Sequence, residues 1–188
     1  INQKGELKFT LRDAESVETY HEDMALYSVR EKGKLRYGYV DKRGETIIDP
    51  VYSGAMSFSQ GKAAVRDAKG KWGFIGRNGE AVIECRYDEV MPFNDRDAAL
   101  VKENGLWGVI DKKGRYIIDP QFEVMRNDGK WFQIKSKENL WGWCDLDGEI
   151  VITPRFEKAF GFFGNLKFIF NHFTAIKTDS YSRFKYTK

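Results

Sequence analysis

"NGLWGVIDKKGRYIIDP" (residues 104–120) contains a Trp-Gly pair, a turn and a short apolar run that ends at proline. Variants of this stretch occur three more times in the 188-residue chain, and its landmarks recur at spacings of 35, 35 and 34 residues. In chain order the landmarks are Tyr37, Gly38, Gly44 and Pro50; Trp72, Gly73, Gly79 and Cys85; Trp107, Gly108, Gly114 and Pro120; and Trp141, Gly142, Gly148 and Pro154. Because all the landmarks recur at the same spacings, the chain contains an internal repeat.

Each copy has the pattern of a β-hairpin. "WGVID" is a β-branched and aromatic run and predicts a strand, and "RYIID" predicts the return strand. Between them, Asp111 can accept a hydrogen bond from the backbone two residues on, and Gly114 can adopt positive φ. This pattern fits a type I turn followed by a glycine bulge. Asp41 and Asp145 hold the same turn position, which Gly76 takes in the second copy.

A third strand precedes each hairpin. The four upstream runs are "MALYSVR", "AAVRD", "AALVKE" and "WFQIKS". One three-stranded antiparallel meander cannot bury enough surface alone, so neighbouring meanders must stack. We therefore expect an all-β protein made of tandem meanders that form an open solenoid or superhelix. A small propeller-like closed ring is the alternative, although propeller blades usually have four strands in about 40–45 residues.

The repeats divide the chain into three parts. We assign residues 25–163 to four repeats, at about 25–58, 59–93, 94–128 and 129–163. Residues 1–24 are expected to form an N-terminal cap or partial repeat, with one strand at "ELKFTL". Residues 164–188 are expected to be a degenerate fifth repeat, in which "NLKFIFN" fits the first strand, or a C-terminal cap. The alternative for this end is an aromatic, basic interaction surface with Phe160, Phe162, Phe163, Lys167, Phe168, Phe170 and Phe173.

Aromatic residues follow the proline position at two fixed offsets. Two residues on are Tyr52, Tyr87, Phe122 and Phe156, and eight residues on are Phe58, Phe93 and Phe162, with Asp128 in the third copy. We expect these rings to cover the gaps between meanders. A glycine inside a strand indicates that an indole or another backbone lies against it. We predict that Trp72, Trp107 and Trp141, with Tyr37 in the first copy, pack on the repeated glycines.

The period, the Trp-Gly pair, the "D-x-x-G" turn and the "IIDP-x-[YF]" ending resemble the bacterial WG (KWG) repeat across residues 25–163. The departures are Tyr37 for Trp, Gly76 for Asp and Cys85 for Pro. The resemblance implies an all-β repeat protein whose expected role is to bind other molecules. It implies no catalytic residues.

Charge and hydropathy argue against two classes of protein. The net charge is +3, but residues 155–188 hold seven Lys/Arg against two acids, so the remainder carries −2. The repeat region therefore lacks the broad basic surface of a nucleic-acid binder. No apolar run approaches the roughly 18 residues of a membrane span. A targeting segment is not visible in the given chain, and the compartment stays open.

No constellation of residues suggests catalysis, a metal or a cofactor. His21 and His172 are isolated in sequence, and Cys85 has no histidine nearby. Cys144 is expected to be a small buried hydrophobe. "DLDGE" (residues 145–149) resembles the start of a calcium loop, but the aligned copies indicate a hairpin turn that offers too few oxygens.

We therefore expect a non-catalytic repeat module that provides a protein-interaction surface. Partner contacts are expected in the variable connections "SGAMSFSQG", "DEVMPFNDRD" and "EVMRNDG". The alternative is a glycan- or cell-wall-binding module that uses exposed aromatic rings, which buried tryptophans would disfavour. A homo-oligomer also stays open, because the sheet edges of such an array must be capped or paired.

Overall fold

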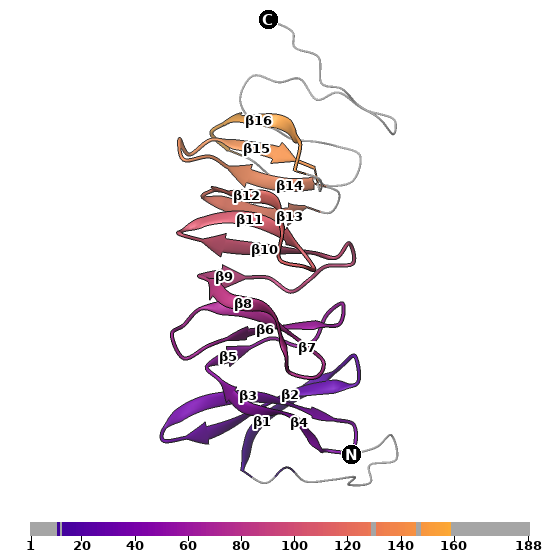
Figure 1. The fold of residues 1–188 in the computed structure, drawn as a ribbon. Coiled ribbons are helices and arrows are strands. Elements are labelled where there is room, and N and C mark those ends of the chain that lie inside the picture. The colour runs from indigo at the N-terminus through magenta and orange to yellow at the C-terminus, as the bar shows by residue number, and fades with distance from the viewer. Residues whose placement is uncertain (1–10, 12, 129–130, 146–147, 159–188) are drawn as a thin grey trace, which may run out of the picture. The chain divides into compact units, whose positions relative to one another are not determined.

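A computed structural model describes residues 11, 13–128, 131–145 and 148–158 (Figure 1). The described strands form four separate antiparallel sheets of four strands each, and none of these sheets is closed into a barrel. The chain divides into two compact units, one ending at Pro120 and one beginning at Gln121. The expected all-β repeat architecture is confirmed.

The four sheets follow one another along the chain. Sheet A contains β1 (Ala14–His21), β2 (Met24–Glu31), β3 (Lys34–Asp41) and β4 (Thr46–Tyr52). Sheet B contains β5 (Gly54–Ala55), β6 (Lys62–Arg66), β7 (Trp72–Gly76) and β8 (Ala81–Tyr87). Sheet C contains β9 (Glu89–Val90), β10 (Ala98–Glu103), β11 (Leu106–Asp111) and β12 (Tyr116–Phe122). Sheet D contains β13 (Val124–Asp128), β14 (Trp131–Lys135), β15 (Trp141–Cys144) and β16 (Ile150–Phe156).

The last three strands of each sheet are the predicted meander, and the structure adds a fourth strand before it. In sheet B this strand is β5, in which Gly54 pairs with Arg66 and Ala55 with Val65. In sheet A it is β1, which lies within the segment expected to be a cap or partial repeat. Four strands therefore fit into one period of the sequence. β5 and β9 also begin before the repeat boundaries that we drew at residues 59 and 94.

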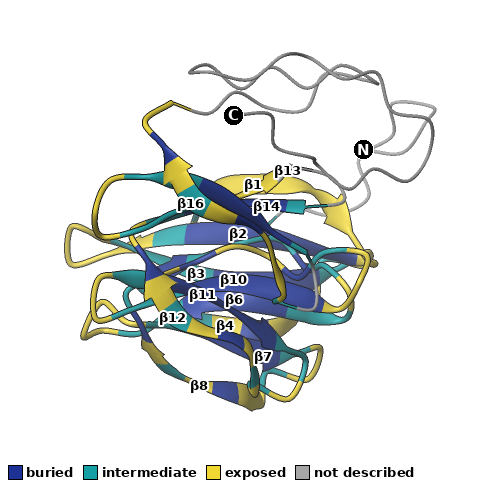
Figure 2. Ribbon diagram, turned by 90° about the horizontal axis from the view of Figure 1, so that it is seen from above, coloured by how far each residue is buried: buried dark blue, intermediate teal, exposed yellow. Residues whose placement is uncertain are grey.

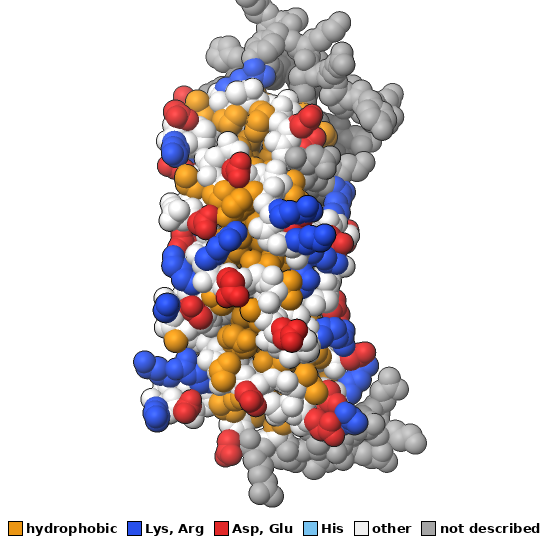
Figure 3. All heavy atoms as spheres, in the orientation of Figure 1, with side chains coloured by type: hydrophobic (Ala, Val, Ile, Leu, Met, Phe, Trp, Pro, Cys, Tyr) orange, Lys and Arg blue, Asp and Glu red, His pale blue; other side chains and the backbone are white. Residues whose placement is uncertain are grey.

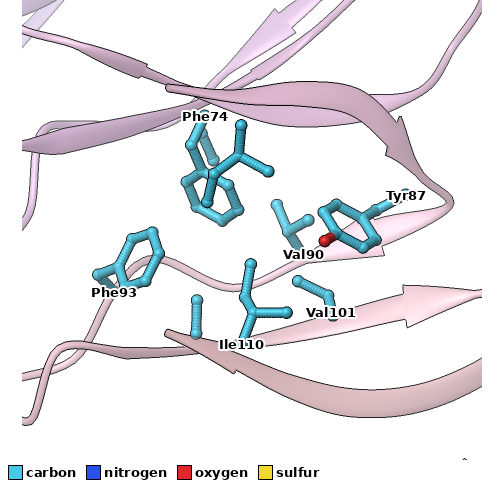
Figure 4. Packing of buried hydrophobic residues seen from close by; sticks show 9 residues of the cluster. Phe74, Tyr87, Val90, Phe93, Val101 and Ile110 are labelled. Carbon is cyan, nitrogen blue, oxygen red and sulfur yellow. The ribbon is translucent and has the colours of Figure 1, made fainter. Parts of the chain in front are cut away.

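Sheets A, B and C of the first unit stack in chain order, with an apolar core between neighbours. The core between A and B contains Met24, Leu26, Tyr39, Ile48, Phe58, Ala63, Val65 and Ile75. The core between B and C contains Ala64, Phe74, Ile83, Tyr87, Val90, Phe93, Ala99, Val101 and Ile110 (Figure 4). Successive residues of a strand point to opposite faces, so β6 buries Ala63 and Val65 on one side and Ala64 on the other. The middle of β6 is therefore buried on both faces, and Figure 2 shows β2, β6 and β10 as largely buried strands.

The aromatic residues eight positions after the proline place do cover the gaps between sheets. Phe58 lies edge-on to Tyr39, with the ring centroids 4.9 Å apart. Phe93 lies against Phe74 at 4.8 Å. Both phenylalanines are buried, which confirms their predicted role in the first unit. Phe162 lies outside the described residues.

Sheet D of the second unit has its own aromatic core. Trp143, Ile152 and Phe156 are buried together, and the rings of Trp143 and Phe156 are 6.0 Å apart. Cys144 is fully buried, as predicted. The two segments "ELKFTL" and "NLKFIFN" lie almost entirely outside the described residues.

Candidate interaction surface

The glycine of each Trp-Gly pair faces the backbone of the return strand. A Cβ at Gly73 would lie 2.5 Å from the carbonyl oxygen of Ile83 and 2.7 Å from the amide nitrogen of Cys85. The same carbonyl approach is 2.4 Å at Gly38, 2.5 Å at Gly108 and 2.4 Å at Gly142. The second candidate, a neighbouring backbone, therefore explains these glycines. The packing of the indoles on them stays a prediction.

A bulge in the return strand brings that backbone close. Trp72 pairs with Tyr87 and Phe74 pairs with Ile83. Between these two pairs β7 moves on by two residues, whereas β8 moves on by four. The extra residues bend the strand toward the glycine. Proline is confined to edge strands and bulges, because it cannot donate to the ladder. The proline position of each repeat lies in this bulge, occupied by Pro50, Cys85, Pro120 and Pro154.

The tryptophans of the Trp-Gly pairs lie beneath cationic side chains of the neighbouring strand. Arg66 lies 5.5 Å from the Trp72 ring centroid, and Lys102 lies 5.5 Å from that of Trp107. Each cation is the cross-strand partner of its tryptophan. Such contacts favour the folded sheet through cation–π attraction. Trp107 is buried, and Trp72 and Trp141 are half-buried.

The turn between the two hairpin strands has the predicted geometry. The Asp111 carboxylate accepts hydrogen bonds from the amides of Lys113 at 2.8 Å and Arg115 at 3.0 Å, and Gly114 has φ of 77°. Partial burial acts to raise the pKa of Asp111, but the two amides and the Arg115 guanidinium outweigh it and lower this pKa below its usual value. In the second copy the Asn78 side chain accepts the Glu80 amide instead, at 3.2 Å.

The return strands β4, β8 and β12 are edge strands that expose an aliphatic residue at the same repeat position. Ile47 is 42% exposed, Val82 41% and Ile117 37%. The next residue in each strand is a buried isoleucine: Ile48, Ile83 and Ile118. We call the three exposed residues Ile47, Val82 and Ile117 the aliphatic column. On the face seen in Figure 3, hydrophobic side chains likewise gather between acidic and basic ones.

An acidic residue follows each buried isoleucine. Asp49, Glu84 and Asp119 are exposed, and we call them the acidic column. Among the described residues, the ion pairs do not involve these three carboxylates. Other acids of the same sheets are paired, such as Glu89 of β9 with Lys102 of β10 at 2.6 Å. Sequence reasoning missed both columns, because it assigned "RYIID" to a return strand without separating the two faces of that strand.

The connections in which we expected partner contacts differ in exposure. Residues 53–61 are mostly buried or half-buried, since they contain β5 and Phe58, and only Gln60 is exposed. Residues 88–97 are more open, with Glu89 and Met91 among the exposed side chains. The return strands therefore offer a more regular surface than the connections do.

The residues that the sequence analysis considered for chemistry are the two cysteines, the two histidines and the "DLDGE" turn. Burial raises the pKa of Cys85, and burial raises that of Cys144 to about 12, so both thiols stay protonated and weakly nucleophilic. His21 lies on the surface 3.3 Å from Thr19, whereas His172 is outside the described residues, as is part of "DLDGE". Within residues 11–158 as described, no group of three His, Cys, Asp or Glu side chains could hold a metal. Nor do those residues include a helix that could cross a membrane.

The family model for the WG containing repeat matches residues 37–72, 72–107, 107–128 and 141–171. The chain belongs to the WG repeat family. The first three matches begin at Tyr37, Trp72 and Trp107, and the fourth begins at Trp141. The family's matches therefore begin at the Trp-Gly positions read from the sequence, and not at the repeat boundaries that we drew at residues 25, 59, 94 and 129.

Other comparisons add little to this assignment. A search of curated proteins finds no match. Among solved structures, the computationally designed Ika8 protein is 12% identical with a TM-score of 0.45, over 81% of this chain and 54% of that one. The chain thus spans about half the length of that structure. The computationally designed Ika4 protein is 10% identical with a TM-score of 0.45, over 74% of this chain and 95% of that one.

Proposed function

We propose that this WG repeat chain is a non-catalytic module that binds another protein through the exposed face of its return strands. The aliphatic column carries the proposal, since Ile47, Val82 and Ile117 are exposed at the same position of three stacked sheets. Single exposed aliphatic residues are common on protein surfaces, whereas apolar side chains that gather in one place mark interaction sites. In this chain the three aliphatic side chains gather because they hold the same repeat position in sheets that stack on one another.

The burial of the tryptophans supports a protein partner over a glycan. Sugar stacking needs an open aromatic face, but Trp107 and Trp143 are buried and Trp72 lies beneath Arg66. The exposed apolar surface of the described return strands is aliphatic instead. Aliphatic side chains suit the apolar core of a protein interface.

Affinity capture with the full chain as bait tests this proposal. A variant with Ile47→Thr, Val82→Thr and Ile117→Thr keeps β-branched residues in the strands, so its melting temperature should stay near that of the native chain. Its matched control is Val17→Thr, an exposed valine of β1 that lies outside the column.

We expect the native chain and the Val17→Thr control to recover the same discrete protein, and the triple variant to lose it. If the triple variant retains that protein, the return-strand face is not the interaction surface. If the native chain recovers insoluble polysaccharide instead, and the triple variant does so equally, the glycan-binding alternative is correct.

A further inference from the structure

We propose that the aliphatic and acidic columns together form a docking surface for a basic amphipathic α-helix whose apolar residues recur every seven positions. This inference rests on the proposed protein-binding function and names the chemistry of the partner. It concerns the first unit, where β4, β8 and β12 carry both columns.

The stacking of the sheets sets the spacing of the two columns. A Cβ at Gly79, in the turn before β8, would lie 3.3 Å from the Ile48 side chain. A Cβ at Gly114, in the turn before β12, would lie 3.3 Å from that of Ile83. The same stacking step thus occurs twice. Sheets packed face to face lie about 10 Å apart, so the members of each column are expected at about 10 Å intervals.

This interval matches an α-helix that crosses the strands. A helix rises about 1.5 Å per residue, so seven residues advance about 10.5 Å. Residues seven apart return to nearly the same face, with a drift of only about 20°. A helix of three heptads can therefore present one apolar residue to each of Ile47, Val82 and Ile117. An extended strand would advance about three residues per step. Its successive contact residues would then point to opposite faces.

The width of the surface also fits a helix. Within each return strand the exposed aliphatic and acidic residues are two positions apart, with a buried isoleucine between them. Two positions along a strand span about 7 Å. A helix with its side chains is about 10–12 Å wide, so it can cover both columns at once. Its apolar stripe would lie on the aliphatic column, and a neighbouring stripe on the acidic column.

The charge of that neighbouring stripe follows from the acidic column. Asp49, Glu84 and Asp119 are exposed and take part in none of the ion pairs formed by the described residues. Lysine or arginine residues seven apart on the helix would meet one carboxylate in each sheet. Such exposed pairs add little affinity singly, but they orient the partner and reject acidic sequences. In β16 the corresponding position is Thr153, so the acidic column is specific to the first unit.

The test measures fluorescence anisotropy of a labelled synthetic peptide with the full chain. The peptide has three heptads. Each heptad has leucine at one fixed position, and lysine at a second fixed position that lies beside the leucine on the helix surface. The test variant is Asp49→Asn, Glu84→Gln and Asp119→Asn. Its control is Glu31→Gln, Asp95→Asn and Glu123→Gln, which removes the same charge from exposed acids elsewhere. The loss of three exposed ion pairs, each of which contributes less than a tenfold change in affinity, predicts that the test variant binds about 10-fold more weakly. The control should bind like the native chain.

Three further peptides sharpen the test: one with glutamate for lysine, one with leucine every fifth residue, and a proline-rich one with leucine every third residue. The inference is overturned if any of them binds as tightly as the basic heptad peptide, or if the test variant binds unchanged. It is also overturned if sedimentation shows that the native chain self-associates through this face and excludes the peptide. If the aliphatic triple variant loses its captured protein but the acidic triple variant keeps it, the helix inference fails and the proposed function stands.

Discussion

Sheets B and C have the same backbone geometry but different residues at two of the repeat's landmarks. Sheet C has Asp111 in the turn and Pro120 in the bulge, where sheet B has Gly76 and Cys85. Nevertheless, the carbonyl oxygen of the bulge lies 2.5 Å from a Cβ placed at Gly73 and 2.5 Å from one placed at Gly108. The repeat therefore tolerates changes at the aspartate and the proline, provided that the glycine is present.

The physical reason is the kind of atom that each landmark meets. The glycine meets backbone, which cannot move aside without breaking the pairing of the strands. The aspartate supplies an acceptor for turn amides, and the Asn78 side chain supplies one in sheet B. The proline supplies a preset φ, which other residues adopt at an entropic cost. We therefore expect substitutions of the glycine to have the largest effect, substitutions of the turn acceptor a smaller one, and substitutions at the proline position the smallest.

Gly73→Val and Gly108→Val should destabilise their sheets strongly and equally. Each places side-chain atoms within backbone of the bulge, and clashes of this kind cost about 3 kcal/mol or more. For a chain of this length the melting temperature should fall by about 6 °C or more, measured by circular dichroism. Gly105→Asn is the control, since Gly105 has open space around its Cβ position and asparagine tolerates its positive φ of 81° better than most residues do. An unchanged melting curve for Gly108→Val would contradict the crowding argument.

Asp111→Ala should cost about 1 kcal/mol, because two turn amides lose their acceptor. Asp111→Asn keeps the acceptor and should cost less. The pKa of Asp111 is lowered in the folded chain, so its carboxylate contributes stability above its unfolded pKa. That contribution is lost as the pH falls through the folded pKa. Urea melts between neutral pH and pH 3 should therefore show a smaller acid-induced loss for Asp111→Asn than for the native chain. Equal losses would show that Asp111 does not stabilise the turn through its charge.

Asn78→Ala should destabilise sheet B, and adding Gly76→Asp should reverse much of that loss. The single change removes the acceptor for the Glu80 amide, at a cost of about 0.5–1 kcal/mol. The aspartate would restore the acceptor from the position used in sheet C. A Cβ at Gly76 would lie 3.2 Å from the Asn78 side-chain oxygen, and the alanine relieves this contact. Thermal melts of the single and double variants measure the effect. A double variant less stable than Asn78→Ala would show that an aspartate at position 76 cannot replace the Asn78 acceptor.

Much of this fold could be predicted from the sequence, because the residues that form the turns and the core recur at fixed positions of each repeat. The hairpin turn follows from Asp111 and Gly114, and the buried role of Phe58 follows from its fixed offset after Pro50. The strand β5 could not be predicted, since two residues, Gly54 and Ala55, show no alternation and are ordered by pairing with β6.

The undecided neighbour of the glycines and the overlooked surface have a common cause. A glycine in a strand indicates a close neighbour without identifying it, and only the register of β8 shows that the neighbour is backbone. The exposure of Val82 beside buried Ile83 depends likewise on β8 being an edge strand. Strand pairing is a tertiary property, which a short apolar run does not specify.

Cys85→Pro should have the smallest effect, a stabilisation of about 0.5 kcal/mol through the reduced freedom of the unfolded chain. The amide nitrogen at this position lies 2.7 Å from the Gly73 Cβ position, and the Pro120 nitrogen lies 2.8 Å from that of Gly108. The backbone at these two positions therefore lies at nearly the same distance from its glycine. Glu84 already lies in an extended strand, which proline requires of the residue before it. The substitution removes a long contact of 3.8 Å between the Cys85 sulfur and the Val65 carbonyl, which offsets part of the gain. Pro120→Ala in sheet C should cost a similar amount. If Cys85→Pro instead lowers the melting temperature by several degrees, the amide of Cys85 donates a hydrogen bond that the other repeats lack, and the bulge of sheet B is maintained differently from that of sheet C.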